Sequence, residues 1–133
     1  MPDSISPELY WLILTTLFTG VLWMPYMLEI IGRAGMFGAL AATGGTEPKA
    51  EWSIRAKKAH ANAVENLVVF APLAIAVHVL DAGSALTANA AAAYFALRVA
   101  HAVVFTFGIP YLRTLTFMGA FGCQLVLVAA LLT

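Results

Sequence analysis

Long apolar stretches separated by short polar segments run along the whole chain. Four of these stretches are long enough to cross a bilayer, whose hydrocarbon core takes about 20 apolar residues of helix. They lie at 9–31, within a helix expected from 48 to 80, at 86–107 and at 115–132. The pattern predicts an all-α membrane protein, a bundle of four transmembrane helices that forms one domain over residues 1–133.

The polar segments set the expected ends of the first two helices. Pro25 should kink the first span, because proline removes a backbone hydrogen bond. The glycine-rich stretch 32–48 indicates a flexible loop. Pro48 suits the first turn of the second helix, with Thr46 or Glu47 as its cap, and this helix should then run without a break.

Two further breaks are expected. Asp81 begins a short turn between the second helix and the third. Gly108 and Pro110 both disfavour continued helix, so a connection that carries Arg113 is expected before the last span.

Composition and charge exclude several classes of protein. Apolar residues make up 62% of the 133 residues and charged residues 11%, with a mean hydropathy of +0.87, which excludes an ordinary soluble domain. The formal net charge is zero, so no nucleic-acid partner is expected. Cys123 is the one cysteine and predicts no intrachain disulfide, and no residues show the spacing of metal ligands.

Lysines and arginines gather at alternate connections. Five lie between the first span and the membrane part of the second helix, and Arg113 lies before the last span. Because cytoplasmic loops are enriched in Lys and Arg, we expect these connections in the cytoplasm and both termini on the non-cytoplasmic side. No basic region precedes the first span, which is therefore expected to remain in the mature protein. We expect a multi-pass integral protein of a bacterial inner membrane.

Residues 55–70 carry a polar helical face to which the other candidate site residues are related below. Four polar side chains share one helical face there, at i, i+3, i+7 and i+10: Arg55, Lys58, Asn62 and Glu65. No charged residue follows Glu65 for the next fifteen positions, so this face enters the membrane with its polar side chains directed inward. A glutamate two turns inside a membrane helix needs a partner or a function.

The third span offers a partner. Arg98, His101 and Phe105 share one of its faces, at i, i+3 and i+7. Counted from the cytoplasmic ends of their helices, Glu65 and His101 lie ~10 Å deep and Arg98 lies ~15 Å deep. Glu65 and Arg98 could therefore form a buried ion pair that only joins two helices. Ionisable residues inside a membrane also mark functional sites, so both interpretations stay open.

The other charges near the cytoplasmic end are mostly positive. A pocket there would favour an anionic ligand with hydrogen-bonding groups, and Asn62 and Asn66 could supply amide partners. The cations that could line it are Arg33, Lys58, Arg98, His101 and Arg113.

Three features of the chain resemble the MAPEG family. They are the segment R-A-K-K-A-H-A-N-A-V-E-N at 55–66, the R-V-A-H of the third span and the presence of four short spans. These are membrane-associated proteins in eicosanoid and glutathione metabolism. The similarity covers nearly the whole chain by topology and, by motif, mainly 58–70 and 98–114. It implies a homotrimer that binds glutathione at subunit interfaces near the cytoplasmic face.

Carried over position by position, the resemblance implies a glutathione site. Its binding residues would be Arg33, Lys58, Asn62, Glu65, Asn66, Arg98, His101 and Phe105. Glu65 would receive the γ-glutamyl ammonium, and Arg113 with Thr114 would act catalytically on the thiolate. Phe105 and Asn66 depart from the pattern, because they stand where tyrosine is common and lack its hydroxyl.

The implied activity is that of a glutathione-dependent transferase or peroxidase acting on lipophilic electrophiles at the cytoplasmic side. A cation beside sulfur lowers the thiol pKa, and arginine stays protonated at physiological pH. The thiolate would then attack an electrophile dissolved in the bilayer. One alternative is a MAPEG-like binding or structural protein without catalysis. Another is a small proton-coupled exporter that uses Glu65 as its proton and cation site. An exporter of this kind would need an acidic residue in the middle of the first span, and this interpretation does not explain Arg98.

Overall fold

The computed structural model describes residues 4–41 and 47–133. This part of the chain is helical and contains no strand. The helices, in order, are α1 (Pro7–Val21), α2 (Trp23–Leu40), α3 (Glu51–Val79), α4 (Ala85–Thr106) and α5 (Pro110–Leu132). With α1 and α2 taken together, four helices have the length and composition to cross a membrane. The prediction of an all-α, multi-pass integral membrane protein is confirmed.

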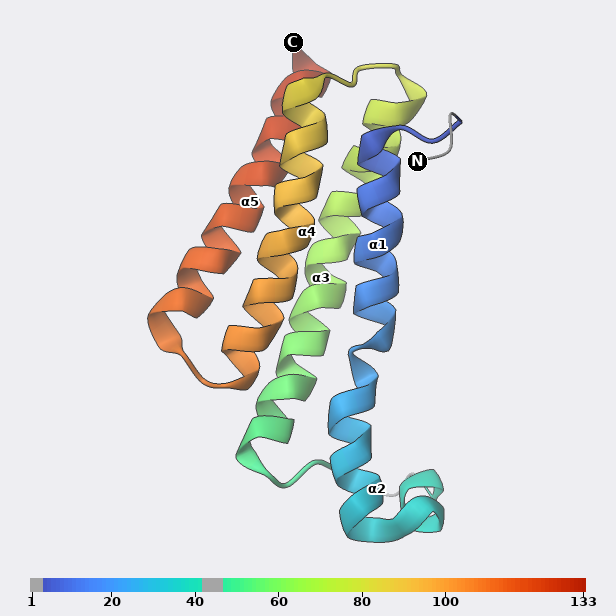
Figure 1. The fold of residues 1–133 in the computed structure, drawn as a ribbon, viewed down its shortest axis with the longest axis vertical. Coiled ribbons are helices and arrows are strands. Elements are labelled where there is room, and N and C mark those ends of the chain that lie inside the picture. Colours follow the sequence, from blue (N-terminus) through green and yellow to red (C-terminus); the bar gives the residue numbers. More distant parts are fainter. Residues whose placement is uncertain (1–3, 42–46) are drawn as a thin grey trace.

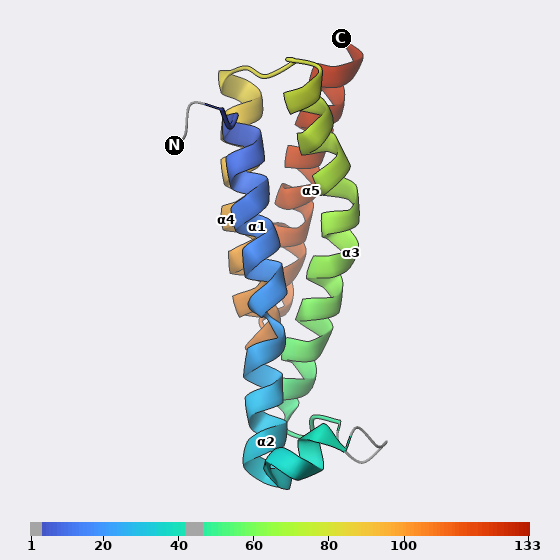
Figure 2. The ribbon, with the colours of Figure 1, turned by 90° about the vertical axis from the view of Figure 1, so that its right-hand side faces the viewer.

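The helices run up and down beside one another as a bundle (Figure 1). α4 packs most extensively against α5, and α3 contacts all four other helices. The chain's N- and C-terminal segments lie at the same end of the bundle as the α3–α4 turn (Figure 2). The α2–α3 connection and the α4–α5 turn lie at the opposite end, which we call the basic end because it carries Arg33, Lys49, Arg55, Lys57, Lys58 and Arg113. That this end faces the cytoplasm stays a prediction.

The first span breaks between α1 and α2, at Leu22. Pro25 has no N–H to donate to the carbonyl of Val21, four residues earlier, and its ring crowds that carbonyl. The Leu22 N–H turns to the Thr19 carbonyl instead, at 3.3 Å. The predicted proline kink is confirmed, three residues before the proline itself.

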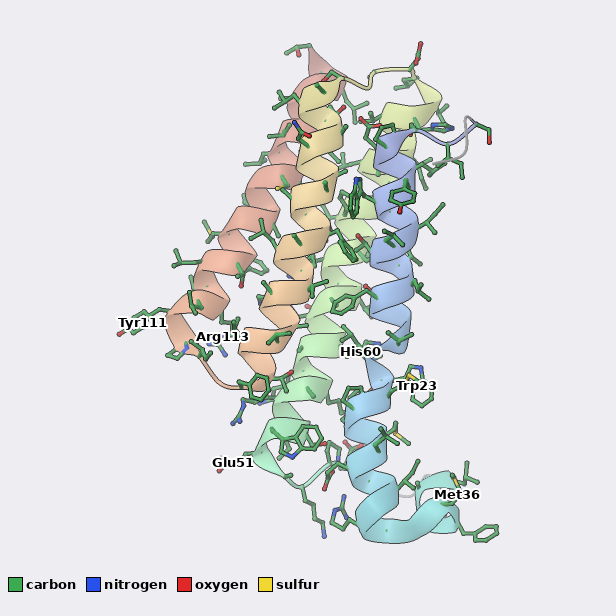
Figure 3. All side chains as sticks on the ribbon, in the orientation of Figure 1. Trp23, Met36, Glu51, His60, Tyr111 and Arg113 are labelled. Carbon is green, nitrogen blue, oxygen red and sulfur yellow. The ribbon has the colours of Figure 1, made fainter. Side chains whose placement is uncertain are left out.

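The flexible loop predicted from residue 32 is wrong over 32–40, because α2 continues to Leu40. Glycine costs a helix only about 1 kcal/mol relative to alanine, so Gly32 and Gly38 are tolerated within it. Gly35 alone leaves the helical region, at φ 78° and ψ 164°, and there the chain bends. The terminal part of α2, which includes Met36, turns aside from the bundle (Figure 3).

α3 begins later than predicted. Its first residue is Glu51, after the N-cap residue Ala50, so Pro48 and Glu47 lie outside the helix and give it no side-chain cap. The other predicted cap, Thr46, lies outside the described residues. From Glu51 the helix runs to Val79, as predicted, and passes through Pro72 without ending.

The N-terminus of α4 carries a capping box. The Ser84 Oγ accepts from the Thr87 N–H at 3.3 Å, and the Ser84 N–H donates to the Thr87 Oγ at 2.7 Å. The Thr87 hydroxyl also donates to the Oε1 of Glu8, whose side chain is buried at the start of α1. A buried acid therefore joins α1 to α4 at the end of the bundle remote from the basic end.

α4 ends in a Schellman motif. The Ile109 N–H donates to the Val104 carbonyl at 2.9 Å, and the Gly108 N–H donates to the Phe105 carbonyl at 3.1 Å. Gly108 has φ 74°, which favours glycine. The predicted break is confirmed, but α5 begins at Pro110, so Arg113 lies in its first turn rather than in a connection.

The core lies between α1, α3, α4 and α5. Its buried residues are Leu12, Phe70, Ala74, Val77, Ala90, Ala91, Tyr94, Ala120 and Leu127. The rings of Phe70 and Tyr94 stack, with centroids 3.9 Å apart. The alanines let the helix backbones approach closely, which is how helices pack in lipid.

Candidate functional site

Polar side chains of α3 and α4 meet inside the bundle, towards the basic end. The Arg98 Nη2 donates to the Asn62 Oδ1 at 2.7 Å. Asn66, one turn further along α3, donates from Nδ2 to the carbonyl and to the Oδ1 of Asn62, at 2.9 and 3.2 Å. Asn62 is thus held from two sides, and its amide orients the Arg98 guanidinium.

Glu65 takes no part in this network. Its side chain is exposed, and none of the ion pairs among the described residues joins it to Arg98. Three residues on from Asn62, it lies about 60° away from Asn62 around the helix axis. The buried Glu65–Arg98 ion pair, considered above as a helix lock, is therefore wrong for the single chain.

Arg98 is 2% exposed, and most of its hydrogen-bonding capacity is unused. Its Nε and Nη1 have no hydrogen-bond partner among residues 4–41 and 47–133. The Nδ1 of His101, also 2% exposed, has none in the same part of the chain. An unpaired buried charge costs several kcal/mol, so this position favours an anionic partner that the described residues do not supply.

A cavity of about 180 Å³ opens beside two partners of this cluster, Asn62 and His101, and is also lined by Phe105, Arg113, Thr114 and Phe117. Arg98 does not line it and reaches it through Asn62. The Arg113 guanidinium carbon lies 5.0 Å from the centre of the Phe105 ring, within range of a cation–π contact. The His101 ring packs against the same ring in a T-shaped arrangement, with centroids 5.6 Å apart. Arg113 lies on the side of α5 that faces α4, whereas Tyr111 points away from the bundle (Figure 3).

The Thr114 hydroxyl is exposed and donates to the Pro110 carbonyl at a long 3.5 Å. It is therefore free to turn towards a ligand in the cavity. The structure brings six of the predicted site residues together: Asn62, Arg98, His101, Phe105, Arg113 and Thr114. Asn66 supports them from one turn away.

Three predicted residues lie apart from the cavity in the single chain. Arg33 pairs with Glu29 at 3.1 Å and donates to the Glu47 carbonyl at 2.7 Å. Lys58 is exposed and lines a separate cavity of about 440 Å³ against the segment 47–48. Glu65 is exposed, as described above.

Sequence reasoning missed three residues around the site. Phe117 lines the cavity next to His101, and the centroids of the two rings are 6.1 Å apart. Tyr94 is fully buried and lies four residues before Arg98, so its place on the same helical face was readable from the spacing. Gln124 is 3% exposed and donates to the Asn66 carbonyl at 3.4 Å. An amide in an otherwise apolar span was a signal that could have found it.

Comparison with known families supports the resemblance. The MAPEG family matches residues 11–133, nearly the whole chain. No curated protein and no solved structure matches this chain.

Proposed function

Because the chain belongs to the MAPEG family, as its motifs predicted, we propose that it binds glutathione at Arg98 and Asn62 and uses the bound thiol in a transferase or peroxidase reaction. Family membership supports, more generally, a membrane protein of glutathione or eicosanoid metabolism. The proposal narrows this to a binding site, an activity and a set of residues.

The observation that carries the proposal is the buried, largely unpartnered guanidinium of Arg98. Glutathione has two carboxylates, and a carboxylate can accept two parallel hydrogen bonds from one guanidinium. Nε and Nη1 of Arg98 have no partner among the described residues, and Nη2 uses one of its two hydrogens on Asn62. One edge of the guanidinium, made by the second Nη2 hydrogen and either Nε or Nη1, therefore keeps both donors for such a contact. Asn62, which holds the remaining nitrogen, also lines the cavity and can contact the peptide part of the ligand.

Arg113 has a different task in this proposal. It lies at the mouth of the same cavity, against Phe105, and Thr114 follows it. A guanidinium beside the sulfur favours the thiolate over the thiol, and a nearby hydroxyl can donate to it. The thiolate then forms a carbon–sulfur bond with a lipophilic electrophile, which releases its leaving group.

The small volume of the cavity also supports an assembly of several copies of this chain. Its volume of about 180 Å³ is smaller than the 300–1,000 Å³ typical of ligand sites, so one chain does not enclose a tripeptide. Lys58 and Glu65, which share a helical face with Asn62, are exposed in the single chain. We propose that a neighbouring copy in a homotrimer covers this face and completes the site, with Glu65 receiving the γ-glutamyl ammonium. Crosslinking in mild detergent should give trimers, and a limit at monomers or dimers would contradict this assembly.

Phe105 favours one second candidate, a glutathione-binding protein without turnover. A tyrosine there would offer the sulfur a hydroxyl, whereas phenylalanine offers only its ring. In this candidate Arg113 would still bind the ligand, but no conjugation would follow.

Calorimetric titration of the detergent-purified protein with glutathione tests the binding, and conjugation to an aryl halide tests the chemistry. We expect binding, and we expect Arg113→Ala to retain most of the affinity while losing the ultraviolet absorbance of the thiolate and the turnover. Lys49→Ala, at the same end of the bundle but outside the cavity, serves as the control. A wild-type protein that does not bind glutathione would refute the proposed function, and binding without conjugation would favour the second candidate.

A further inference from the structure

The C-terminus of α4 has one carbonyl that its own turn does not satisfy. A helix leaves its last four carbonyls without partners inside the helix. In α4 three of them, those of residues 103, 104 and 105, accept from the N–H groups of Phe107, Ile109 and Gly108. The fourth belongs to Thr106, and its partner comes from another helix.

That partner is Arg55, on the polar face of α3. Its Nε donates to the Thr106 carbonyl at 2.8 Å, across 51 positions of sequence. The bond is charge-assisted, and it places a cation at the negative end of the α4 dipole. Arg55 also contacts Glu51, at 3.9 Å, and the Glu51 side chain is 92% exposed. Exposed pairs of this kind contribute little, so the bond to α4 is the stronger contact.

Gly108 makes room for this contact. A Cβ at position 108 would lie 3.2 Å from the Nε and 3.3 Å from the Cζ of Arg55. The guanidinium therefore lies directly against the glycine backbone, at the residue where the chain reverses with φ 74°. The turn and the arginine fit each other: a side chain at 108 would displace the guanidinium.

The same turn places Arg113. The Arg113 N–H donates to the Ile109 carbonyl at 3.2 Å, and the Arg113 guanidinium lies over Phe105 in the last turn of α4. Both contacts depend on how the segment 106–110 leaves α4. From this geometry we infer that Arg55 is a positioning residue, whose guanidinium fastens the α4–α5 turn and so holds Arg113 at the cavity. The catalytic consequence rests on the proposed function, whereas the fastening of the turn does not.

The first test needs no ligand. In the intact protein in detergent, Arg55→Gln should speed hydrogen exchange at the amides of Gly108, Ile109 and Arg113 by roughly ten- to hundredfold, the effect of losing one charge-assisted hydrogen bond. Arg55→Lys, which keeps a cation and a donor, should recover part of the protection. Lys57→Gln is the matched control, because Lys57 pairs with Glu47 and not with the turn. Unchanged exchange in Arg55→Gln would overturn the inference.

The second test uses glutathione and an aryl halide. Arg55→Gln should raise the pH at which the bound thiol ionises and lower kcat roughly tenfold, with KM for glutathione within roughly twofold of the wild type, and Arg55→Lys should restore most of the rate. A variant with less folded protein but an unshifted ionisation would show a merely structural role. A variant with a raised KM and a normal kcat would show a direct ligand of glutathione, and either result would overturn the inference. If the wild type does not bind glutathione, the proposed function fails while the exchange test still decides what Arg55 does.

Discussion

Replacing Arg98 by methionine should separate the stability of the protein from its affinity for glutathione. The guanidinium is buried, with one hydrogen bond to Asn62 and two nitrogens unpartnered among the described residues. Exchanging buried ionic groups for apolar residues of similar volume is often neutral or stabilising by about 1–4 kcal/mol. Against this stands the charged bond to Asn62, worth about 1.5–3 kcal/mol. The free energy of unfolding of the ligand-free variant should therefore lie within about 3 kcal/mol of the wild-type value.

Binding should respond quite differently. Loss of a charge-assisted contact weakens affinity roughly ten- to hundredfold. Glutathione at 100 times the wild-type Kd stabilises the wild type by about 2.7 kcal/mol, whereas a variant with a hundredfold weaker Kd gains only about 0.4 kcal/mol. The assay is denaturant titration in mixed micelles, followed by tryptophan fluorescence, with and without glutathione.

Gln124→Met is the matched control for Arg98→Met. Gln124 is similarly buried, but its bond to the Asn66 carbonyl is long, at 3.4 Å, and its side chain is neutral. Its loss should leave glutathione affinity unchanged. The reasoning is refuted if Arg98→Met lowers the free energy of unfolding by clearly more than about 3 kcal/mol without ligand, or if it binds glutathione as the wild type does.

Three further outcomes are expected. The orientation can be tested in a Cys123→Ala background with a membrane-impermeant thiol reagent added outside intact cells. Lys49→Cys should resist the reagent and Ala85→Cys should react with it. The reverse pattern would show that the predicted orientation is wrong. Glu65→Gln should fold normally, because none of the residues in 4–41 and 47–133 forms an ion pair with the exposed carboxylate, yet bind glutathione roughly tenfold less tightly by calorimetry; unchanged affinity would remove Glu65 from the site. Gly108→Ala should lower the free energy of unfolding by about 1–2 kcal/mol in a denaturation assay, because alanine at φ 74° is strained; equal stability would contradict this.

The residues of the site were predictable where one helix decides the arrangement. Arg98, His101 and Phe105 recur at helical spacing, and the structure places all three at or beside the cavity. Gly108 and Pro110 mark the end of α4 because each has its own backbone preference. Such features depend on local geometry, which a sequence pattern contains.

Contacts between helices were harder to predict. Counting residues along α3 and α4 put Glu65 and Arg98 at similar depth, but depth does not fix how each helix is rotated about its axis. Asn62, one turn away on α3, faces Arg98 instead. The prediction of a loop from residue 32 was wrong for a related reason. The number of glycines does not show which glycine leaves the helix. Only Gly35 does so within α2, while Gly32 and Gly38 remain helical.

The bond between Thr87 and Glu8 has a consequence for how the protein is made. It joins residues 79 positions apart, so it can form only after synthesis has reached the start of the third membrane span. Until then the Glu8 carboxylate at the start of α1 lacks the Thr87 hydroxyl, and water at the bilayer surface takes its place. A nascent chain that ends before α4 should therefore leave Glu8 open to a water-soluble carbodiimide, and the complete chain should protect it. The docking of α4 is then the step of biogenesis at which the Glu8 side chain loses its contact with water.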